Sequence, residues 1–429
     1  MKLAPTPARA LLSLLWRRLR IRMRGLRIRE RNAIQIAPEE LMRIDACWAV
    51  SVGLSQVDPI QGADFQARHL LLALHAGEPY RVARALALEA GHASTAGARA
   101  RPRVQKLLST AREIAERLNH PHALAMSDLN AGAASYFEGR FHESIGLFET
   151  AEQTLRERCT GVAWELNTVQ LYALRTLFFL GWLRELERRA PAFLKDARER
   201  GDLYAETHLR TRISYIRWLM TDEPEKARED LREAMERWSH RGFHLQHFWE
   251  WVGQVEIALY EGDAATACAL VEKSWKALKR SMLLRVQMAR ILAWHLRGRS
   301  AVAAGGPGAL AVAEHDAHRI EKEDAAWSKP LGLSLRAGVS CGRQQREEAS
   351  SLLARAEAGF HSADMALFAA AARRARGLLM GGGEGRALVD GADDWMFRQT
   401  IRRPDRMAAM LVPGGWWRDA AASAEGPRS

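Results

Sequence analysis

Three histidines have a spacing that could bring their imidazoles onto one helix face. His240, His244 and His247 stand at i, i+4 and i+7, and such side chains lie on neighbouring helical turns. Zinc can be held by three imidazoles, but Gly242 separates the first histidine from the others and no further ligand follows at a suitable spacing. The pattern favours histidines that cap or pack at a helix terminus, and we predict no metal and no other cofactor.

Other residues with catalytic potential lack the partners that the chemistry requires. His315 and His318 form only a pair, and the glycine cluster at 381–385 (GGGEG) lacks the spacing and the preceding strand of a phosphate-binding loop. The sequence contains no HRD or DFG triplet of a kinase domain. We therefore predict no catalytic residue and expect that the chain is not an enzyme.

A segment rich in aromatic and imidazole side chains is the first candidate for a binding patch. Residues 241–251 have the sequence RGFHLQHFWEW, and residue types of this kind are enriched in protein interfaces. The candidate residues are His244, Gln246, His247, Trp249 and Trp251. Tryptophans on apolar helix faces more often fill a core, so packing inside the fold is the alternative for Trp249 and Trp251.

The basic character of the chain is concentrated at its beginning. Residues 1–31 contain Lys2 and nine arginines against Glu30 alone, a net charge of +9 out of +12 for the whole chain. Candidate contacts to an anionic partner are Arg17, Arg18, Arg20, Arg22, Arg24, Arg27 and Arg29. An apolar stripe shares this helix: Leu12, Leu15, Trp16, Leu19, Met23 and Leu26.

The apolar stripe has several interpretations. We expect an outer helix, extending at least to Gly25, that buries its stripe against the first repeat and exposes its arginines. The alternatives are contact with a membrane surface, with nucleic acid or with an acidic partner. Only the arginine cluster would support a nucleic-acid or membrane partner.

A periodic turn signal predicts the elements that position these residues. Candidate hairpin turns follow one another at intervals of 36 to 44 residues after Gly139, with apolar helical segments on both sides. They are marked by Gly77, Gly139, Gly181, Asp222, Gly262, Gly306, Gly342 and Gly383. A period of about 40 residues is typical of stacked helix pairs. The fold class predicted is therefore an all-α solenoid.

A ladder of small and large residues recurs around these turns. Gly132 precedes the turn at Gly139, and Phe141, Ser144, Phe148 and Ala151 follow it; similar ladders follow Asp222, Gly262 and Gly342. Small residues are required where two helices cross closely, and large ones fill the remaining space. At these positions the chain resembles the tetratricopeptide repeat family, although its period is longer. The resemblance implies a right-handed superhelix with a concave groove.

Longer stretches resemble one family together. They include ERCTGVAWELNT (157–168) and RERGDLYAETHLRT (198–211), with the segments 25–50, 62–97, 241–263 and 394–414. They are similar to the C-terminal helical region of large bacterial serine/threonine protein kinases, which carry a kinase domain, an ATPase module and a helical-repeat tail. The resemblance places this chain with the tail, because the kinase and ATPase motifs are absent from it, and no catalytic residue is carried over.

These observations predict four segments and a regulatory role. The segments are a basic helix and linker (1–34), N-terminal hairpins (35–120), tetratricopeptide-like repeats (121–412) and a flexible tail (413–429). We expect a cytoplasmic, non-catalytic interaction module that holds a protein or peptide in its groove and acts as the sensing or docking tail of a kinase system, with a kinase or ATPase domain as a partner in trans. The alternatives are a split part of an active serine/threonine kinase and a nucleic-acid-associated regulator that uses the arginine-rich head.

Overall fold

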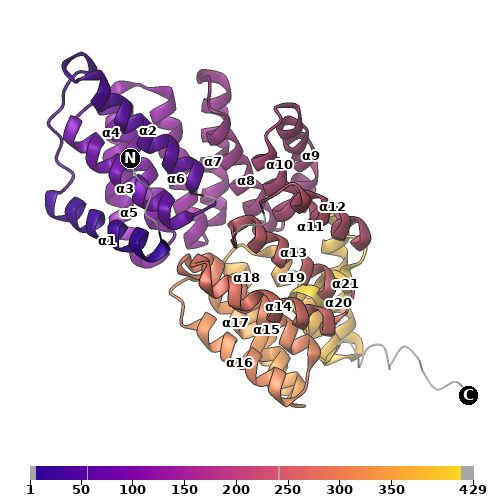
Figure 1. The fold of residues 1–429 in the computed structure, drawn as a ribbon. Coiled ribbons are helices and arrows are strands. Elements are labelled where there is room, and N and C mark those ends of the chain that lie inside the picture. Colours follow the sequence, from indigo (N-terminus) through magenta and orange to yellow (C-terminus); the bar gives the residue numbers. More distant parts are fainter. Residues whose placement is uncertain (1–5, 56, 240–241, 417–429) are drawn as a thin grey trace, which may run out of the picture. The chain divides into compact units, whose positions relative to one another are not determined.

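The computed structural model describes residues 6–55, 57–239 and 242–416, and these residues form an all-α fold (Figure 1). The chain is 83% helical and the described part has no strand. The predicted all-α fold of consecutively packed helices is confirmed. None of the helices in this part is long and apolar enough to cross a bilayer. Residues 417–429 of the predicted tail and His240 lie outside the described residues.

The chain folds as two compact units, which we describe separately. Unit 1 consists of Met1–Glu138 and Glu143–Ala173, and unit 2 of Gly139–His142 and Leu174–Ser429. The helices of unit 1 pack as neighbours in chain order: α1 lies on α3, α2 on α3, α3 on α4, and α4 on both α5 and α6. Their bounds are α1 Pro7–Arg24, α2 Pro38–Leu54, α3 Pro59–Ala76, α4 Pro79–Ser94, α5 Arg101–Leu118 and α6 Pro121–Glu138, followed by α7 Phe141–Arg158 and α8 Ala163–Leu180, which each continue across a unit boundary.

Unit 2 continues the same principle of antiparallel helix pairs. Its first helices are α9 Leu183–Glu199, α10 Leu203–Leu209, a π-helical segment Arg210–Ser214, α11 Tyr215–Met220, α12 Pro224–Glu236, α13 Leu245–Tyr260 and α14 Ala264–Arg280. They are followed by α15 Gln287–Ala304, α16 Pro307–Glu321, α17 Ser328–Gly342, α18 Arg346–Ser362, α19 Ala366–Met380, α20 Gly382–Arg398 and α21 Pro404–Leu411. Pairs such as α15 and α16, α17 and α18, and α19 and α20 pack against each other along their lengths.

Most of the predicted turns lie where the sequence places them. Left-handed backbone occurs at Gly77, Gly139, Gly181, Asp222, Gly262 and Gly306. The last two turns are displaced by one or two residues: Gln344 is left-handed in place of Gly342, and Gly381 and Gly382 in place of Gly383. Gly342 ends α17 and faces Leu310 of α16, so close packing explains this glycine better than the turn does.

The predicted ladder is buried and works by close approach. A β-carbon on Gly132 of α6 would lie 2.8 Å from the Phe148 ring of α7, and the Ser144 hydroxyl donates a hydrogen bond of 2.9 Å to the Gly132 carbonyl. The equivalent residues after later turns are also buried: Ala227, Leu231 and Ala234; Ala267 and Val271; Ala349, Leu353 and Ala356. The small-and-large pattern therefore marks the helix crossings.

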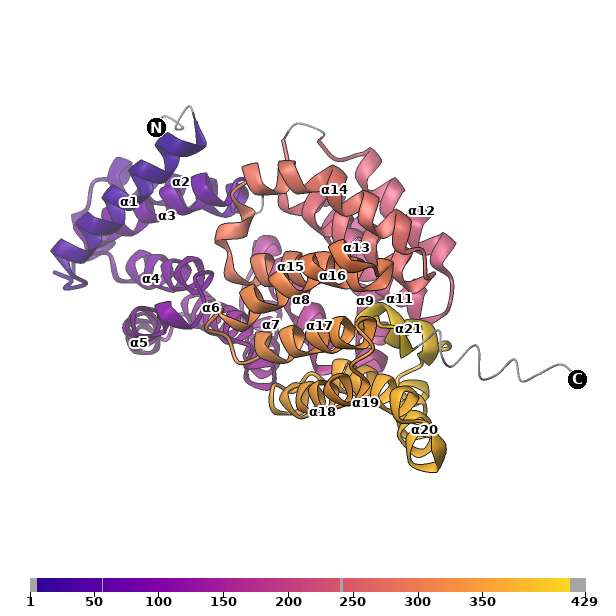
Figure 2. The ribbon, with the colours of Figure 1, turned by 90° about the horizontal axis from the view of Figure 1, so that it is seen from below.

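Unit 2 differs from the open array that the repeat pattern suggests, because its last helices return to its first ones. The Leu183 amide at the start of α9 donates to the Gln399 side chain at 3.0 Å, and the Arg402 amide donates to the Met220 carbonyl at 2.8 Å. Helix α21 packs on α13 and α19 (Figure 2). The C-terminal segment thus covers a face of unit 2 that an open groove would leave free.

Unit 2 contains a fully buried histidine that is uncharged. His208 of α10 is fully buried, and its Nδ1 accepts a hydrogen bond of 3.2 Å from the Gln246 amide. Burial, assisted by the positive charge of Arg212, lowers the pKa of His208 to about 3. The imidazole is therefore neutral near pH 7.

The helix crossing at Gly132 can be tested with a matched pair of glycine substitutions. Gly132→Ala should lower the free energy of unfolding by about 1–3 kcal/mol, because the new methyl group overlaps Phe148. Gly146 lies exposed in α7 with open space around its β-carbon position, so Gly146→Ala should instead raise it by about 0.5–1 kcal/mol through helix propensity. Urea unfolding followed by circular dichroism measures both changes. Equal effects of the two variants would contradict close packing at Gly132.

Buried His208 should make the protein sensitive to mild acid. An unfolded histidine binds its proton below about pH 6.5, whereas folded His208 remains neutral down to about pH 3. Stability should therefore fall as the pH drops through this window, by up to about 1.4 kcal/mol per pH unit for this group. In His208→Gln, which cannot titrate, urea midpoints between pH 7 and pH 5 should depend less steeply on pH than in the wild type. An unchanged slope would show that His208 is not the source.

Candidate functional site

Unit 1 contains a pocket of about 440 Å³ on the side where several helices begin. Trp48 of α2, Tyr80 and Arg84 of α4, and His122 of α6 form one part of its lining. The other lining residues are His120, Pro121, Arg158, Cys159, Thr160, Gly161, Val162 and Glu165. Aromatic and basic side chains thus predominate, and Glu165 is the one carboxylate among the residues that line it.

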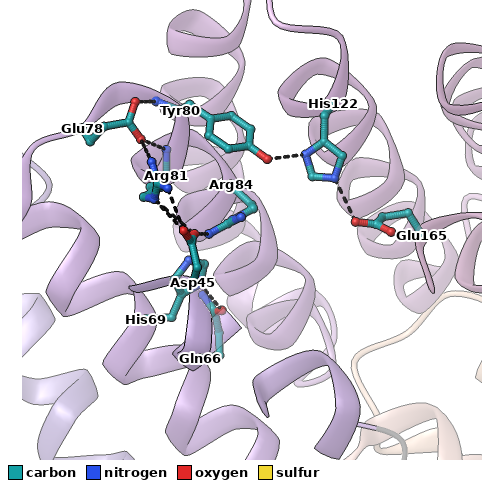
Figure 3. Close-up of polar contacts among 9 residues, drawn as sticks. All are labelled: Asp45, Gln66, His69, Glu78, Tyr80, Arg81, Arg84, His122 and Glu165. Carbon is teal, nitrogen blue, oxygen red and sulfur yellow. Dashed lines mark hydrogen bonds and ion pairs between the residues drawn. The ribbon is translucent and has the colours of Figure 1, made fainter. Parts of the chain in front are cut away.

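A carboxylate behind the pocket fixes two arginines of α4 (Figure 3). Asp45 accepts hydrogen bonds from Nε and Nη2 of Arg81 at 3.1 and 2.6 Å, and from Nη2 of Arg84 at 2.5 Å. Burial raises the pKa of Asp45, but the hydrogen bonds and charges of Arg84 and Arg81 outweigh it, so that the pKa lies below its usual value. Asp45 therefore stays ionised and orients both guanidinium groups.

The start of α4 explains why these side chains point in this direction. Pro79 occupies the first turn, and the Glu78 carboxylate accepts from the backbone amides of Tyr80 and Arg81 at 3.1 and 2.9 Å. Such a cap satisfies amides that have no partner within the helix. Arg81 and Arg84 stand three residues apart and share one helix face. Capping and spacing together present both arginines to Asp45 of α2.

Arg84 also forms part of an aromatic stack. Its guanidinium carbon lies 4.6 Å from the centre of the Trp48 ring and 5.3 Å from that of Tyr80. Arginine faces pack favourably on such rings. Nε–H of Arg84 and Nε1–H of Trp48 are buried and have no hydrogen-bond partner among the described residues. Two hydrogen-bond donors in the lining are therefore unsatisfied, and a buried unsatisfied donor is unfavourable.

A second chain of hydrogen bonds crosses the pocket from α4 to α8 (Figure 3). The Tyr80 hydroxyl lies 3.0 Å from Nδ1 of His122, and Nε2 of His122 lies 2.8 Å from Glu165. When neutral His122 carries its proton on Nε2, Tyr80 donates to Nδ1 and Nε2 donates to Glu165. His120 stacks on Tyr80 with ring centres 4.2 Å apart. The aromatic residues are thereby held in place.

The titration behaviour of the pocket does not favour nucleophilic chemistry. Burial raises the pKa of the Tyr80 hydroxyl and of the Cys159 thiol. A reactive thiolate needs the opposite shift. Burial and then the neighbouring His122 lower the pKa of His120. Near pH 7 the pocket thus offers a phenol, a thiol and the neutral imidazole of His120, all of which can form hydrogen bonds.

The residues of the predicted binding patch do not gather on one exposed surface. Gln246, Trp249 and Trp251 are buried, and Gln246 is the hydrogen-bond partner of His208. His244 and His247 are partly exposed at the start of α13, where the His244 amide donates to Nδ1 of His247 at 3.1 Å. Of the five candidate residues, a partner could therefore reach only these two histidines. Their hydrogen bond lies at the start of α13, which agrees with the expectation that they cap or pack at a helix terminus. In the part of the chain that the structure describes, no cluster of His, Cys, Asp and Glu side chains could hold a metal ion.

The arginines of the head divide into two groups. Arg17 pairs with buried Asp64 at 3.0 Å, and Arg18 approaches buried Glu89 at 3.4 Å. The others are exposed: Arg20, Arg22, Arg24, Arg27 and Arg29. Helix α1 ends at Arg24 before Gly25, as predicted.

The expectation that α1 buries its apolar stripe is wrong. Leu12, Leu15, Trp16, Leu19 and Met23 are exposed. The helix packs instead through Ala10, Leu14 and Ile21, because the two inward ion pairs turn this side towards α3 and α4.

Sequence reasoning missed the pocket. Its residues come from segments separated by up to 117 positions, from Trp48 to Glu165, and none forms a known motif. The signals available were the His120–Pro121–His122 run at a helix start and the basic pair Arg81 and Arg84. Neither identifies a ligand without the fold. No protein-family model matches the chain, and no curated protein matches it.

The two hydrogen-bond networks should differ in their contribution to stability. Asp45→Asn leaves Arg81 and Arg84 without their anion and should lower the free energy of unfolding by about 1–3 kcal/mol, less than for a fully buried pair because Asp45 is partly exposed. Tyr80→Phe removes one hydrogen bond and should lower it by about 0.5–1.5 kcal/mol.

Urea unfolding at pH 7 measures both variants. The control is Glu39→Gln, at an exposed carboxylate in the first turn of α2, and it should change stability by less than about 0.5 kcal/mol. An Asp45→Asn effect no larger than that of the control would contradict the anchoring role of Asp45.

Proposed function

We propose that this chain is a non-catalytic protein-interaction module and that the pocket of unit 1 receives a segment of its partner. One observation carries the proposal: a pocket of about 440 Å³ has aromatic and basic walls whose side chains are held by the Asp45 and Tyr80–His122–Glu165 networks. Side chains that are already ordered lose little entropy when a ligand binds. Aromatic residues and arginine are also the types that contribute most to protein interfaces.

The charges of the lining favour an acidic segment. Arg84 is already paired with Asp45, and Glu165, the one lining carboxylate, is bonded to His122, so exposed Arg158 is the remaining charge in the lining. Arg84 and Trp48 also each retain an N–H without a partner among the described residues. A carboxylate of the ligand would meet the positive charge, and an apolar neighbour in the ligand would pack on Trp48 and Tyr80. The raised pKa values of Tyr80 and Cys159 support binding over catalysis.

The physiological setting that we propose is a serine/threonine kinase signalling system. Its support is the similarity of the segments 25–50, 62–97, 157–168, 198–211, 241–263 and 394–414 to the helical tails of large bacterial kinases. In this setting the chain would sense or dock a partner, either in trans with a kinase or ATPase domain or as a separated part of an active kinase. The return of α21 onto α13 covers a face of unit 2, so we assign the partner to the pocket of unit 1.

The test uses peptides selected on the full chain from a random phage-displayed library. We expect the selected peptides to combine acidic and apolar residues, and Arg158→Glu to weaken a selected peptide at least about tenfold in calorimetric titration, as expected for loss of a close charge pair. Arg156→Glu is the matched control, because Arg156 lies on the same helix end, is exposed and does not line the pocket. The affinity of Arg156→Glu for the selected peptide should stay within about twofold of that of the wild type.

Two results would argue against the pocket as a recognition site. Selected peptides without acidic residues would remove the charge argument. Equal losses in Arg158→Glu and Arg156→Glu would show that binding follows the general charge of the surface.

A further inference from the structure

Helix α1 carries two apolar faces, and only one of them is used for packing. Ala10, Leu14 and Ile21 are buried in unit 1. Five other apolar side chains of the helix are between 46% and 67% exposed: Leu12, Leu15, Trp16, Leu19 and Met23. At about 100° per residue, these five lie within an arc of about 100° centred almost opposite the buried face. The spacing i, i+3, i+4, i+7 and i+11 makes them one continuous stripe.

The orientation of this stripe is fixed by ion pairs on the packed side. Arg17 is bound to Asp64, which is also paired with Arg68 at 2.7 Å, and Arg18 faces Glu89, which accepts from Arg103 at 2.8 Å. Both carboxylates are buried. Rotating α1 to bury the stripe would remove one of the two arginines from each buried carboxylate, which is unfavourable. The stripe is therefore held outward, and α1 lies at the outer edge of unit 1 in both views (Figure 1, Figure 2).

Exposed arginines border the stripe on both sides. On the helical wheel Arg22 lies beside Leu15, and Arg9 and Arg20 lie beside Trp16. All three are exposed, as are Arg24, Arg27 and Arg29 at and beyond the end of the helix. The surface thus combines leucine, methionine and tryptophan in the middle with guanidinium groups along the edges. Helices that lie in the interface of an anionic bilayer have this distribution.

We propose that α1 is a docking face for the surface of an anionic lipid membrane. The helix lies parallel to the bilayer, with Leu12, Leu15 and Leu19 among the upper acyl chains, Trp16 at the level of the headgroups, and Arg20 and Arg22 against lipid phosphates. Tryptophan prefers this depth because one part of its ring is apolar and its N–H is polar. The inference is independent of the pocket, which involves other helices of unit 1.

Two other occupants fit the surface less well. A second copy of this chain would bring a head of net charge +9 against the same charge, which opposes pairing through this face. Nucleic acid would engage the arginines, and a base could stack on Trp16, but the phosphates and base edges of a duplex would leave most of the leucine and methionine stripe uncovered. A lipid surface matches both the apolar and the charged parts.

The experiment is flotation of the full chain with vesicles, compared between pure phosphatidylcholine and phosphatidylcholine with about 30% phosphatidylserine. We expect strong binding to the anionic vesicles only, and weaker binding as the salt concentration rises from about 50 to about 300 mM. Trp16→Ser/Leu19→Ser should lower the partition coefficient at least about tenfold, because two apolar anchors are lost. Arg20→Gln/Arg22→Gln should lower it by a similar factor and reduce the dependence on salt.

Matched control variants distinguish vesicle binding through α1 from nonspecific binding through other exposed residues. Ile34 and Met42 are exposed apolar residues of unit 1 outside α1, and Ile34→Ser/Met42→Ser should bind vesicles like the wild type. Arg99 and Lys106 are exposed basic residues elsewhere in unit 1, and Arg99→Gln/Lys106→Gln should also bind normally. All these sites are exposed, so the variants should keep the wild-type circular dichroism spectrum.

Three results would overturn the proposal. The first is the absence of wild-type binding to anionic vesicles. If the protein then forms a concentration-dependent dimer that Trp16→Ser/Leu19→Ser abolishes, the occupant of α1 is a second copy of the chain. The second is binding to single-stranded or double-stranded nucleic acid in place of vesicles. The third is an equal loss of vesicle binding in the control variants.

Discussion

Close helix crossings are the constraint on which this fold depends. At Gly132 of α6, Gly253 of α13 and Gly298 of α15, a β-carbon would come within 3.0 Å of a buried side chain of the neighbouring helix. Each helix pair must approach this closely because neither helix can bury its apolar face alone. The crossings also set the pocket, since α4 and α6 meet at Gly91 and Asn130. That approach brings the starts of both helices together, with Tyr80 on one and His122 on the other.

A carboxylate that holds an arginine recurs in both units with different surroundings. In unit 1, Asp45 orients Arg84 in the wall of the pocket. In unit 2, Glu256 accepts from Arg299 at 2.6 Å and from the Tyr215 hydroxyl at 2.7 Å, and all three side chains are buried. Arg299 also donates to the Met410 carbonyl at 3.0 Å. A carboxylate–arginine pair therefore lines a pocket in unit 1, whereas the corresponding kind of pair joins distant helices in unit 2.

The sequence predicts the local features of this fold well and its long-range features poorly. The turn at Gly262 and the small residues Ala227 and Ala349 follow from periodicity, because each depends on neighbours within one hairpin. The rotation of α1 depends on Asp64 and Glu89, far along the chain, and the apolar pattern alone allowed either face to pack. Trp249 and Gln246 seemed suited to an interface because residue type does not distinguish a buried patch from an exposed one. The pocket needs side chains from α2 to α8, whose meeting is decided by packing angles that the sequence pattern does not specify.

The contacts between the last and first helices of unit 2 affect how this unit can fold during its synthesis. The Leu183 amide finds its acceptor in Gln399, 216 residues later, and Arg402 lies 181 residues from Thr221, to whose carbonyl it donates. A simple repeat array can fold progressively as each hairpin leaves the ribosome. Here the Leu183 amide of α9 and the Met220 and Thr221 carbonyl groups at the end of α11 reach their partners only after the final segment is synthesised, at about 5–20 residues per second. Until then these backbone groups depend on water, and loss of only the last helices would leave the beginning of the unit without these hydrogen bonds.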